Sequence, residues 1–190
     1  MSMTVSRRKD NRTPKVFMHQ VADIRGGVSV KTSELGGDYI KEGAVLTAPD
    51  ANGQCHVVKV GDVYAAVGAS ETTVKIKKFH NFKVGDFILI AIGGLASTIT
   101  AIDTSNKDYD TLTIDQALGA IEIGGQIVEA AAKSTTTTSA LKYTPFSLVG
   151  TGKEIEKNSN FVTDAWVFGV TKGNPLPSFV MAYLKGIVNY

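Results

Sequence analysis

The chain contains little cysteine and little histidine. Its single cysteine, Cys55, excludes an intramolecular disulfide bond, which fits folding in a reducing compartment. The three histidines, His19, His56 and His80, are scattered along the sequence. Adjacent side chains on a strand face opposite ways, so we expect Cys55 and His56 neither to share a metal ion nor to form a nucleophile–base pair. A Ser–His–Asp triad stays open, because triads assemble in space.

Long apolar runs are also missing. No segment approaches the roughly 20 apolar residues of a membrane span. The basic residues near the N-terminus are not followed by the apolar segment of a secretory signal. The net charge of +2 over 190 residues argues against wholesale nucleic-acid binding. We therefore expect neither a membrane nor a nucleic acid as partner.

Residues typical of strands and turns dominate what is present. Hydrophobic residues make up 43% of the chain, glycine occurs 19 times, and Val, Ile, Thr, Phe and Tyr recur throughout. This composition favours a packed, mainly β protein. The regular spacing of short strands and turns predicts small antiparallel β-barrel or sandwich modules.

The clearest β pattern is "TTVKIKKFHNFKVGDFILIAIGG", residues 72–94. Val74 and Ile76 alternate with polar neighbours, which predicts a strand with those two side chains inward. A loop with aromatic anchors at Phe79 and Phe82 follows, and then a turn at residues 84–86. The segment "FILIAI", residues 87–92, is apolar at every position, so we expect a strand that is covered on both faces.

The domain organisation that we predict has three parts. Residues 1–20 form an extended basic arm, residues 21–68 join 134–190 in a base β module, and residues 69–133 form an inserted β-meander or barrel. The polar stretch 134–140 is interpreted as a connector between the modules.

One short helix is expected near the C-terminus. It would be capped by Ser178, would run to Leu184 or Lys185, and would be followed by a last strand, "IVNY". The helix is apolar nearly all round, so it should be buried within the body or against a neighbouring subunit. The candidate residues for an oligomer interface are Phe179, Val180, Tyr183 and Leu184.

Three short motifs resemble parts of known functional sites, but the residues around them do not complete those sites. His80-Asn81 ends self-splicing domains, but no nucleophile follows it here, and we expect both side chains to bond to local backbone. "GTGK", residues 150–153, lacks the spacing and the hydroxyl of a phosphate loop. "DTSNKDYD", residues 103–110, is interpreted as a hairpin turn with local Asx-type bonds, with a weak cation site as the alternative.

No enzyme and no cofactor are expected from these patterns. Trp166 is interpreted as a core residue, because a Trp side chain buries so much area, with a sugar-stacking platform as the alternative. The first 20 residues carry five basic side chains against one acidic one, Asp10. With almost no aromatic residue to stack on bases and no apolar stripe, this arm favours docking on an acidic protein surface. The alternative is a solvated tail.

Four segments together resemble the head fiber and capsid decoration proteins of tailed bacteriophages, notably those of Bacteroidetes. They are "EGAVLTAPDANGQCHVVK", "TTVKIKKFHNFKVGDFI", "TITAIDTSNKDYDTLTID" and "SALKYTPFSLVGT", in this order. The similarity spans roughly residues 20–190, and "KFHNFKVGDFI" and "ALKYTP" are its most distinctive pieces. The basic arm is the part least like that family.

The resemblance implies a non-enzymatic virion protein. Such a protein decorates the outer surface of the capsid after assembly in the host bacterial cytoplasm, binds the major capsid protein or other shell proteins, and often forms a homotrimer. A carbohydrate-binding adhesion module on the virion, directed at host-surface glycans, is the alternative. The candidate capsid-binding residues are Arg7, Arg8, Lys9, Arg12 and Lys15.

Overall fold

A computed structural model describes residues 14–155 and 161–190 and confirms a mainly β protein. Most strand pairs are antiparallel. Within the described residues the helical elements are a 3-10 turn at Thr32–Glu34 and one short helix, α1 (Ser178–Met181). The predicted class and the single C-terminal helix are therefore correct.

The first sheet combines the start, the middle and the end of the chain. β17 (Ile187–Asn189) adds to β16 in parallel. The main path of this sheet runs through β1 (Phe17–Asp23), β16 (Ala165–Thr171), β13 (Ser147–Val149), β4 (Val45–Leu46) and β6 (Val57–Val58).

Two small sheets accompany the first sheet. One joins β15 (Phe161–Thr163), β2 (Val28–Val30) and β5 (Gln54–Cys55), and the other pairs β14 (Lys153–Glu154) with β3 (Tyr39–Ile40).

The second sheet is built from the middle of the sequence. It curls until its outer strands meet at a single bridge between Val63 and Ile76, and no barrel closes in the part of the chain described. Its strand order is β7 (Val60–Asp62), β12 (Gln126–Ala130), β9 (Phe87–Leu89), β10 (Ala96–Asp103), β11 (Tyr109–Ile114) and β8 (Thr73–Lys77). Val74 and Ile76 point inward while their neighbours are exposed, as the alternation predicts.

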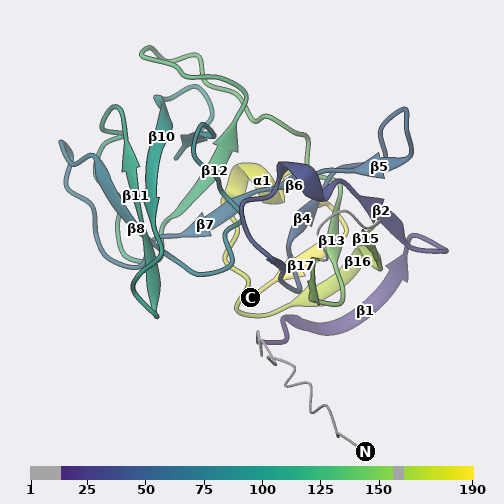
Figure 1. Ribbon diagram of the computed structural model, residues 1–190. Coiled ribbons are helices and arrows are strands. Elements are labelled where there is room, and N and C mark those ends of the chain that lie inside the picture. Colours follow the sequence, from purple (N-terminus) through teal and green to yellow (C-terminus); the bar gives the residue numbers. More distant parts are fainter. Residues whose placement is uncertain (1–13, 156–160) are drawn as a thin grey trace, which may run out of the picture.

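Three buried clusters hold these sheets together. One fills the inside of the curled second sheet, and another lies between the first sheet and the β15–β2–β5 sheet. The central cluster joins residues of both large sheets with Val180 and Leu184 from the region of α1. Figure 1 shows the two sheets side by side with α1 at their junction. The strands thus fall into two groups, and the two groups share a core.

The strand predicted at residues 87–92 is shorter than expected. β9 ends at Leu89, and Ile92 is exposed in a turn that Gly93 completes with a φ of 77°. The part that is strand is covered on both faces, because Ile88 packs into the curled sheet and Leu89 into the central cluster.

The helix also ends early, and Ser178 does not cap it. Pro177 occupies the N-cap position, and no side-chain capping bond is made. After Met181 the bonds change to the i→i+3 type, from the N–H of Tyr183 to the carbonyl of Val180 and from the N–H of Leu184 to that of Met181. The apolar segment is therefore a single helical turn followed by tight turns, and it is buried within the chain itself.

Two segments interpreted as arm or connector belong to the body. The last residues of the predicted arm, from Phe17, form the start of β1, which pairs with β16. In the stretch 134–140, Ser134 and Ser139 are buried, Ser134 bridges to Ala96, and the N–H of Gly93 donates to the carbonyl of Ser139. Both segments gain their structure from partners that are distant in sequence.

Candidate functional site

The arm enters the body at a fixed point. Arg7, Arg8, Lys9 and Arg12 lie outside the described residues, and Lys15 is exposed directly before β1. The backbone N–H groups of Val16 and Phe17 donate to Glu42 Oε1 at 3.0 and 2.9 Å. This carboxylate holds the chain where the basic segment joins the sheet.

The residues predicted for an oligomer interface divide into two groups. Val180 and Leu184 are 0% and 2% exposed and belong to the central cluster of their own chain. Phe179 is half-buried against that cluster, whereas Tyr183 is 48% exposed. Tyr183 and the rim of Phe179 thus remain accessible to another chain, and the interface itself stays a prediction.

An apolar strip on the first sheet was not predicted. Phe168 and Val170 share one face of β16, because side chains two residues apart on a strand point the same way. Val188 lies opposite Val170 on β17, and Tyr190 continues that face. Phe168, Val188 and Tyr190 are 55%, 61% and 66% exposed. We call these four residues the outer strip.

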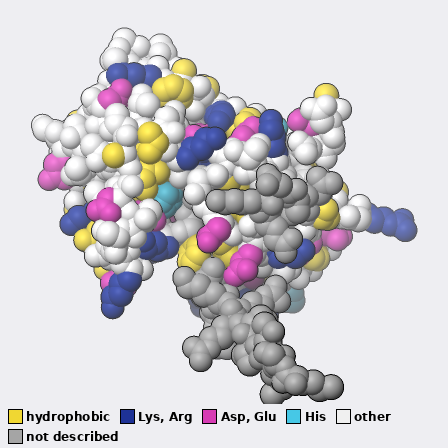
Figure 2. Space-filling model, in the orientation of Figure 1, with side chains coloured by type: hydrophobic (Ala, Val, Ile, Leu, Met, Phe, Trp, Pro, Cys, Tyr) yellow, Lys and Arg dark blue, Asp and Glu magenta, His cyan; other side chains and the backbone are white. Residues whose placement is uncertain are grey.

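Charge is evenly distributed over the described body on the side shown in Figure 2. Basic and acidic side chains are interspersed there. This fits a body that is close to neutral while the predicted arm carries five basic residues.

The His80-Asn81 loop is held by one local bond and by two bonds to distant segments, whereas only bonds to local backbone were predicted. Phe82 N–H donates to His80 Nδ1 at 2.9 Å, so Nε2 carries the proton and donates to Asp110 at 3.1 Å. Asn81 donates to the carbonyl of Tyr39 and has a φ of 62°. Burial lowers the pKa of His80, and Asp110 opposes that effect. The imidazole therefore serves to shape this loop.

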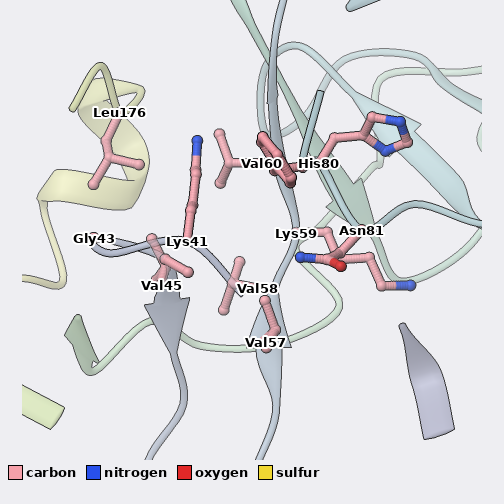
Figure 3. A pocket seen from close by; sticks show the side chains of 12 residues that line it. Lys41, Gly43, Val45, Val57, Val58, Lys59, Val60, His80, Asn81 and Leu176 are labelled. Carbon is pink, nitrogen blue, oxygen red and sulfur yellow. The ribbon is translucent and has the colours of Figure 1, made fainter. Parts of the chain in front are cut away.

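A small cavity lies beside this loop, with a volume of about 20 Å³. Figure 3 shows valine side chains of β4, β6 and β7 around it, with His80 and Asn81 on one side and Leu176 on the other. This volume is about that of one water molecule. The cavity is too small to hold a substrate.

A second polar group surrounds His56. Its Nδ1 lies 3.0 Å from Glu34 Oε2, and the Tyr143 hydroxyl donates to the same oxygen at 2.6 Å. The imidazole stacks on Tyr143 with ring centroids 4.4 Å apart, and Asp50 lies 3.5 Å from its other nitrogen. Burial raises the pKa of Glu34, but the hydrogen bonds from Tyr143, His56 and Lys31 outweigh it and hold the pKa at about 2.

This cluster does not form the triad that the sequence left open. In residues 14–155 and 161–190 no serine hydroxyl bonds to His56 or His80, and Thr47 Oγ1 donates to a backbone carbonyl. The members of the His56 cluster come from distant segments, and no periodic pattern in the sequence links them.

The pKa of Glu34 makes stability depend on pH. A carboxyl group whose pKa is lower in the folded chain stabilises it above the ordinary pKa, here 4.5, and this contribution is lost as the pH falls toward 2. We expect Glu34→Gln to flatten the pH dependence of the free energy of unfolding in that range. Urea unfolding at stepped pH measures this, with Glu122→Gln as the exposed control. Equal slopes in wild type and Glu34→Gln would contradict it.

A buried ionic cluster joins β12 to the link before β7 and to the turn before β9. Lys59 Nζ donates to Asp86 Oδ2 at 2.5 Å and to Glu129 Oε1 at 3.2 Å. Lys59 and Glu129 are each 1% exposed, and Asp86 is 6% exposed. Lys142, at the rim, donates to the same Glu129 oxygen at 2.9 Å. The sequence does contain a signal for this cluster, since Lys59 interrupts "VVKV" and Glu129 interrupts "IVEA", two otherwise apolar strands.

The other motifs carry no assembled site. Trp166 is half-buried, and its Nε1 donates to Asp164 at 2.9 Å, so it is neither fully core nor a free platform. The 103–110 segment makes the predicted Asx bonds, from Ser105 N–H to Asp103 and from Asp108 N–H to Asn106. In the described part of the chain no three His, Cys, Asp or Glu side chains are placed to hold a metal ion.

Comparison with protein-family models, curated proteins and solved structures finds no match to this chain. Among the residues described, no helix has the length and apolar character needed to cross a membrane.

Proposed function

We propose that the protein is a non-catalytic structural component of a bacteriophage virion that decorates the outer capsid surface. The observation that carries this proposal is the arrangement of β1. The basic segment leads directly into β1 at Lys15, and the sheet that β1 joins bears the uncovered outer strip. Exposed apolar patches of this kind are typical of surfaces that meet another protein.

The resemblance of residues 42–59, 72–88, 98–115 and 139–151 to head fiber and decoration proteins supports the same proposal. The partner is the major capsid protein or another shell protein, and the cationic segment is attracted to acidic groups on that shell. Attraction between opposite charges speeds the encounter, and added salt weakens that attraction. The protein then belongs to the virion and is assembled in the host bacterial cytoplasm.

Attachment through the basic segment is tested with two variants. One deletes residues 1–13 and leaves β1 and its bonds to Glu42 intact. The other changes Arg7, Arg8, Lys9 and Arg12 to glutamine. We expect both variants to weaken binding to capsids lacking this protein by about tenfold or more, which is at least about 1.4 kcal/mol. Cosedimentation at two salt concentrations measures this.

The matched control removes the same number of charges from the exposed body. Its substitutions to glutamine are at Lys75, Lys77, Lys107 and Lys185. Circular dichroism establishes that each variant is folded. Wild-type binding by both arm variants would overturn attachment through this segment, and an equal loss in the body control would make the effect one of net charge.

The outer strip is proposed as the contact between copies in a homotrimer. The outer strip is apolar, so it suits a contact between copies. It carries no acidic group, so the basic segment is not expected to bind to it. We expect wild type to be trimeric by sedimentation equilibrium and Phe168→Glu combined with Val188→Glu to be monomeric. Ile123→Glu is the control, because Ile123 is 71% exposed but lies just before β12 of the second sheet. A monomeric wild type would contradict the trimer.

A carbohydrate-binding adhesion role is the second candidate, and one observation favours it. Tyr64 is 43% exposed, its ring centroid lies 4.9 Å from that of Tyr109, and Lys75 lies over the Tyr109 ring. Paired aromatic rings beside a cation offer a stacking surface for a sugar. Glycan-array binding that is lost in Tyr64→Ala or Trp166→Ala, with the fold intact, would favour adhesion over decoration.

A further inference from the structure

The buried ionic cluster brings an amine and two carboxyl groups together where water is scarce. Lys59 comes from the link between β6 and β7, Asp86 from the turn before β9, and Glu129 from β12. Glu129 N–H also donates to the carbonyl of Lys59 at 3.0 Å, so these two residues are neighbours across the ladder. Ile88 lies opposite Glu129 in the register, and Asp86, two residues earlier, points to the same side.

Burying this cluster costs desolvation free energy, and its hydrogen bonding is incomplete. Burying charged groups carries a desolvation penalty that the pairing repays only with good geometry and full hydrogen bonding. Glu129 Oε2 is buried and has no hydrogen-bond partner among the described residues. A buried carboxylate with one oxygen free is suited to take up and return a proton.

We propose that Lys59 and Asp86 condense spontaneously in the folded chain to form an intramolecular isopeptide bond, with Glu129 as the group that relays the proton. Lys59 Nζ is the nucleophile and Asp86 Cγ the electrophile. The fold holds the amine 2.5 Å from Asp86 Oδ2, which replaces an encounter in solution by a fixed approach.

The step balances as the loss of one water. Glu129 takes a proton from the Lys59 ammonium and passes it to Asp86, and the resulting neutral amine attacks Cγ of the neutral Asp86 carboxyl group to form the C–N bond. The C–O bond to one Asp86 oxygen then breaks. That oxygen leaves as water with two protons, both of which come from the former ammonium, one of them by way of Glu129. One ammonium and one carboxylate become one amide and one water, and no oxidant or other reactant is needed. The low-dielectric surroundings favour the neutral product over the buried charges.

Geometry selects the bonding partners. Glu129 is the more distant carboxylate, at 3.2 Å, and its Oε1 already accepts a bond from Lys142. Lys142 itself is a poor nucleophile, because its side chain is 33% exposed and the bond to Glu129 outweighs the lowering by burial and raises its pKa. Lys59 and Asp86 are therefore the reactive pair. Glu129, whose Oε1 accepts a bond from Lys142, relays the proton.

The bond would join two positions 27 residues apart and would close a loop containing β7 and β8. A covalent cross-link of this kind restricts the unfolded chain, as a disulfide bond does. The chain's single cysteine excludes an internal disulfide, so this would be a redox-independent substitute. The bond does not depend on where the protein attaches, and the capsid-binding experiment can fail while this one succeeds.

The test is the mass of the denatured full-length protein. We expect wild type to be lighter than its sequence mass by one water, about 18 Da. Trypsin does not cleave after an acylated lysine, so residues 42–75 should remain one peptide, joined to residues 84–107. Full sequence mass in the folded protein after prolonged incubation would overturn the proposal.

Variants separate this bond from other losses of water. Lys59→Arg should have its full sequence mass, and a loss that persists in that variant would belong to a cyclised Asp or Asn elsewhere and would count against the proposal. Glu129→Gln should fold and keep its full mass, because it cannot relay the proton. Asp86→Asn should lose ammonia, about 17 Da, if it reacts. A cross-link mapped to Glu129 instead of Asp86 would also contradict the assignment.

Discussion

Replacement of Lys59 by methionine is expected to lower the free energy of unfolding by about 3–5 kcal/mol, because it removes both the amine of the proposed isopeptide bond and the cation that two buried carboxylates share before that bond forms. Asp86 and Glu129 are 6% and 1% exposed, so water cannot replace the ammonium. Urea unfolding followed by circular dichroism measures the loss. A change below about 1 kcal/mol would place the pair among surface ion pairs, whose contribution is small.

A triple variant tells which property of the cluster stabilises the fold. Lys59→Met, Asp86→Leu and Glu129→Leu together remove every charge that Lys59 contacts. Apolar replacements of a whole buried ion cluster are often neutral or stabilising. Recovery of wild-type stability is therefore expected if the cluster acts only through charge, and a persistent shortfall is expected if the isopeptide bond has formed.

Replacement of Phe82 by alanine is expected to cost about 3–5 kcal/mol, because it opens a cavity in the core of the curled second sheet. Phe82 is 2% exposed and belongs to that cluster. Its ring also packs against Gly61, where an added Cβ would lie 2.9 Å from a ring carbon. The site is therefore tightly filled, and the same urea unfolding experiment gives the loss.

Phe146→Ala is the control for Phe82→Ala, because Phe146 is 46% exposed. We expect its cost to stay within about 0.5 kcal/mol, as for most surface substitutions. Equal costs for the two variants would show that the loop at residues 78–83 is not anchored as described.

The sequence predicted the parts of the fold in which one strand carries its own signal. Alternation identified residues 73–77, because that strand has one buried and one exposed face. It missed β1 from Phe17, whose residues are mostly exposed and which exists through pairing with β16 about 150 positions later. It extended β9 and α1 too far, because apolar residues continue after the backbone has turned.

The candidate sites were predicted less well, for a physical reason. The outer strip depends on which strands become neighbours, and no local pattern fixes that Val188 lies beside Val170. The Lys59 cluster was visible as charges inside apolar strands, but only the register places Glu129 opposite Lys59. The basic segment was visible directly, since charge needs no folding to be counted.

The most direct test of the account is equilibrium cosedimentation of the full-length protein with phage capsids that lack it. We predict saturable binding at a fixed number of copies per capsid, weakened by added salt and weakened by about tenfold or more when residues 1–13 are removed. Absence of saturable binding, or binding that is unchanged by that deletion, would contradict the proposal that this β protein is tethered to a capsid by its basic N-terminal segment.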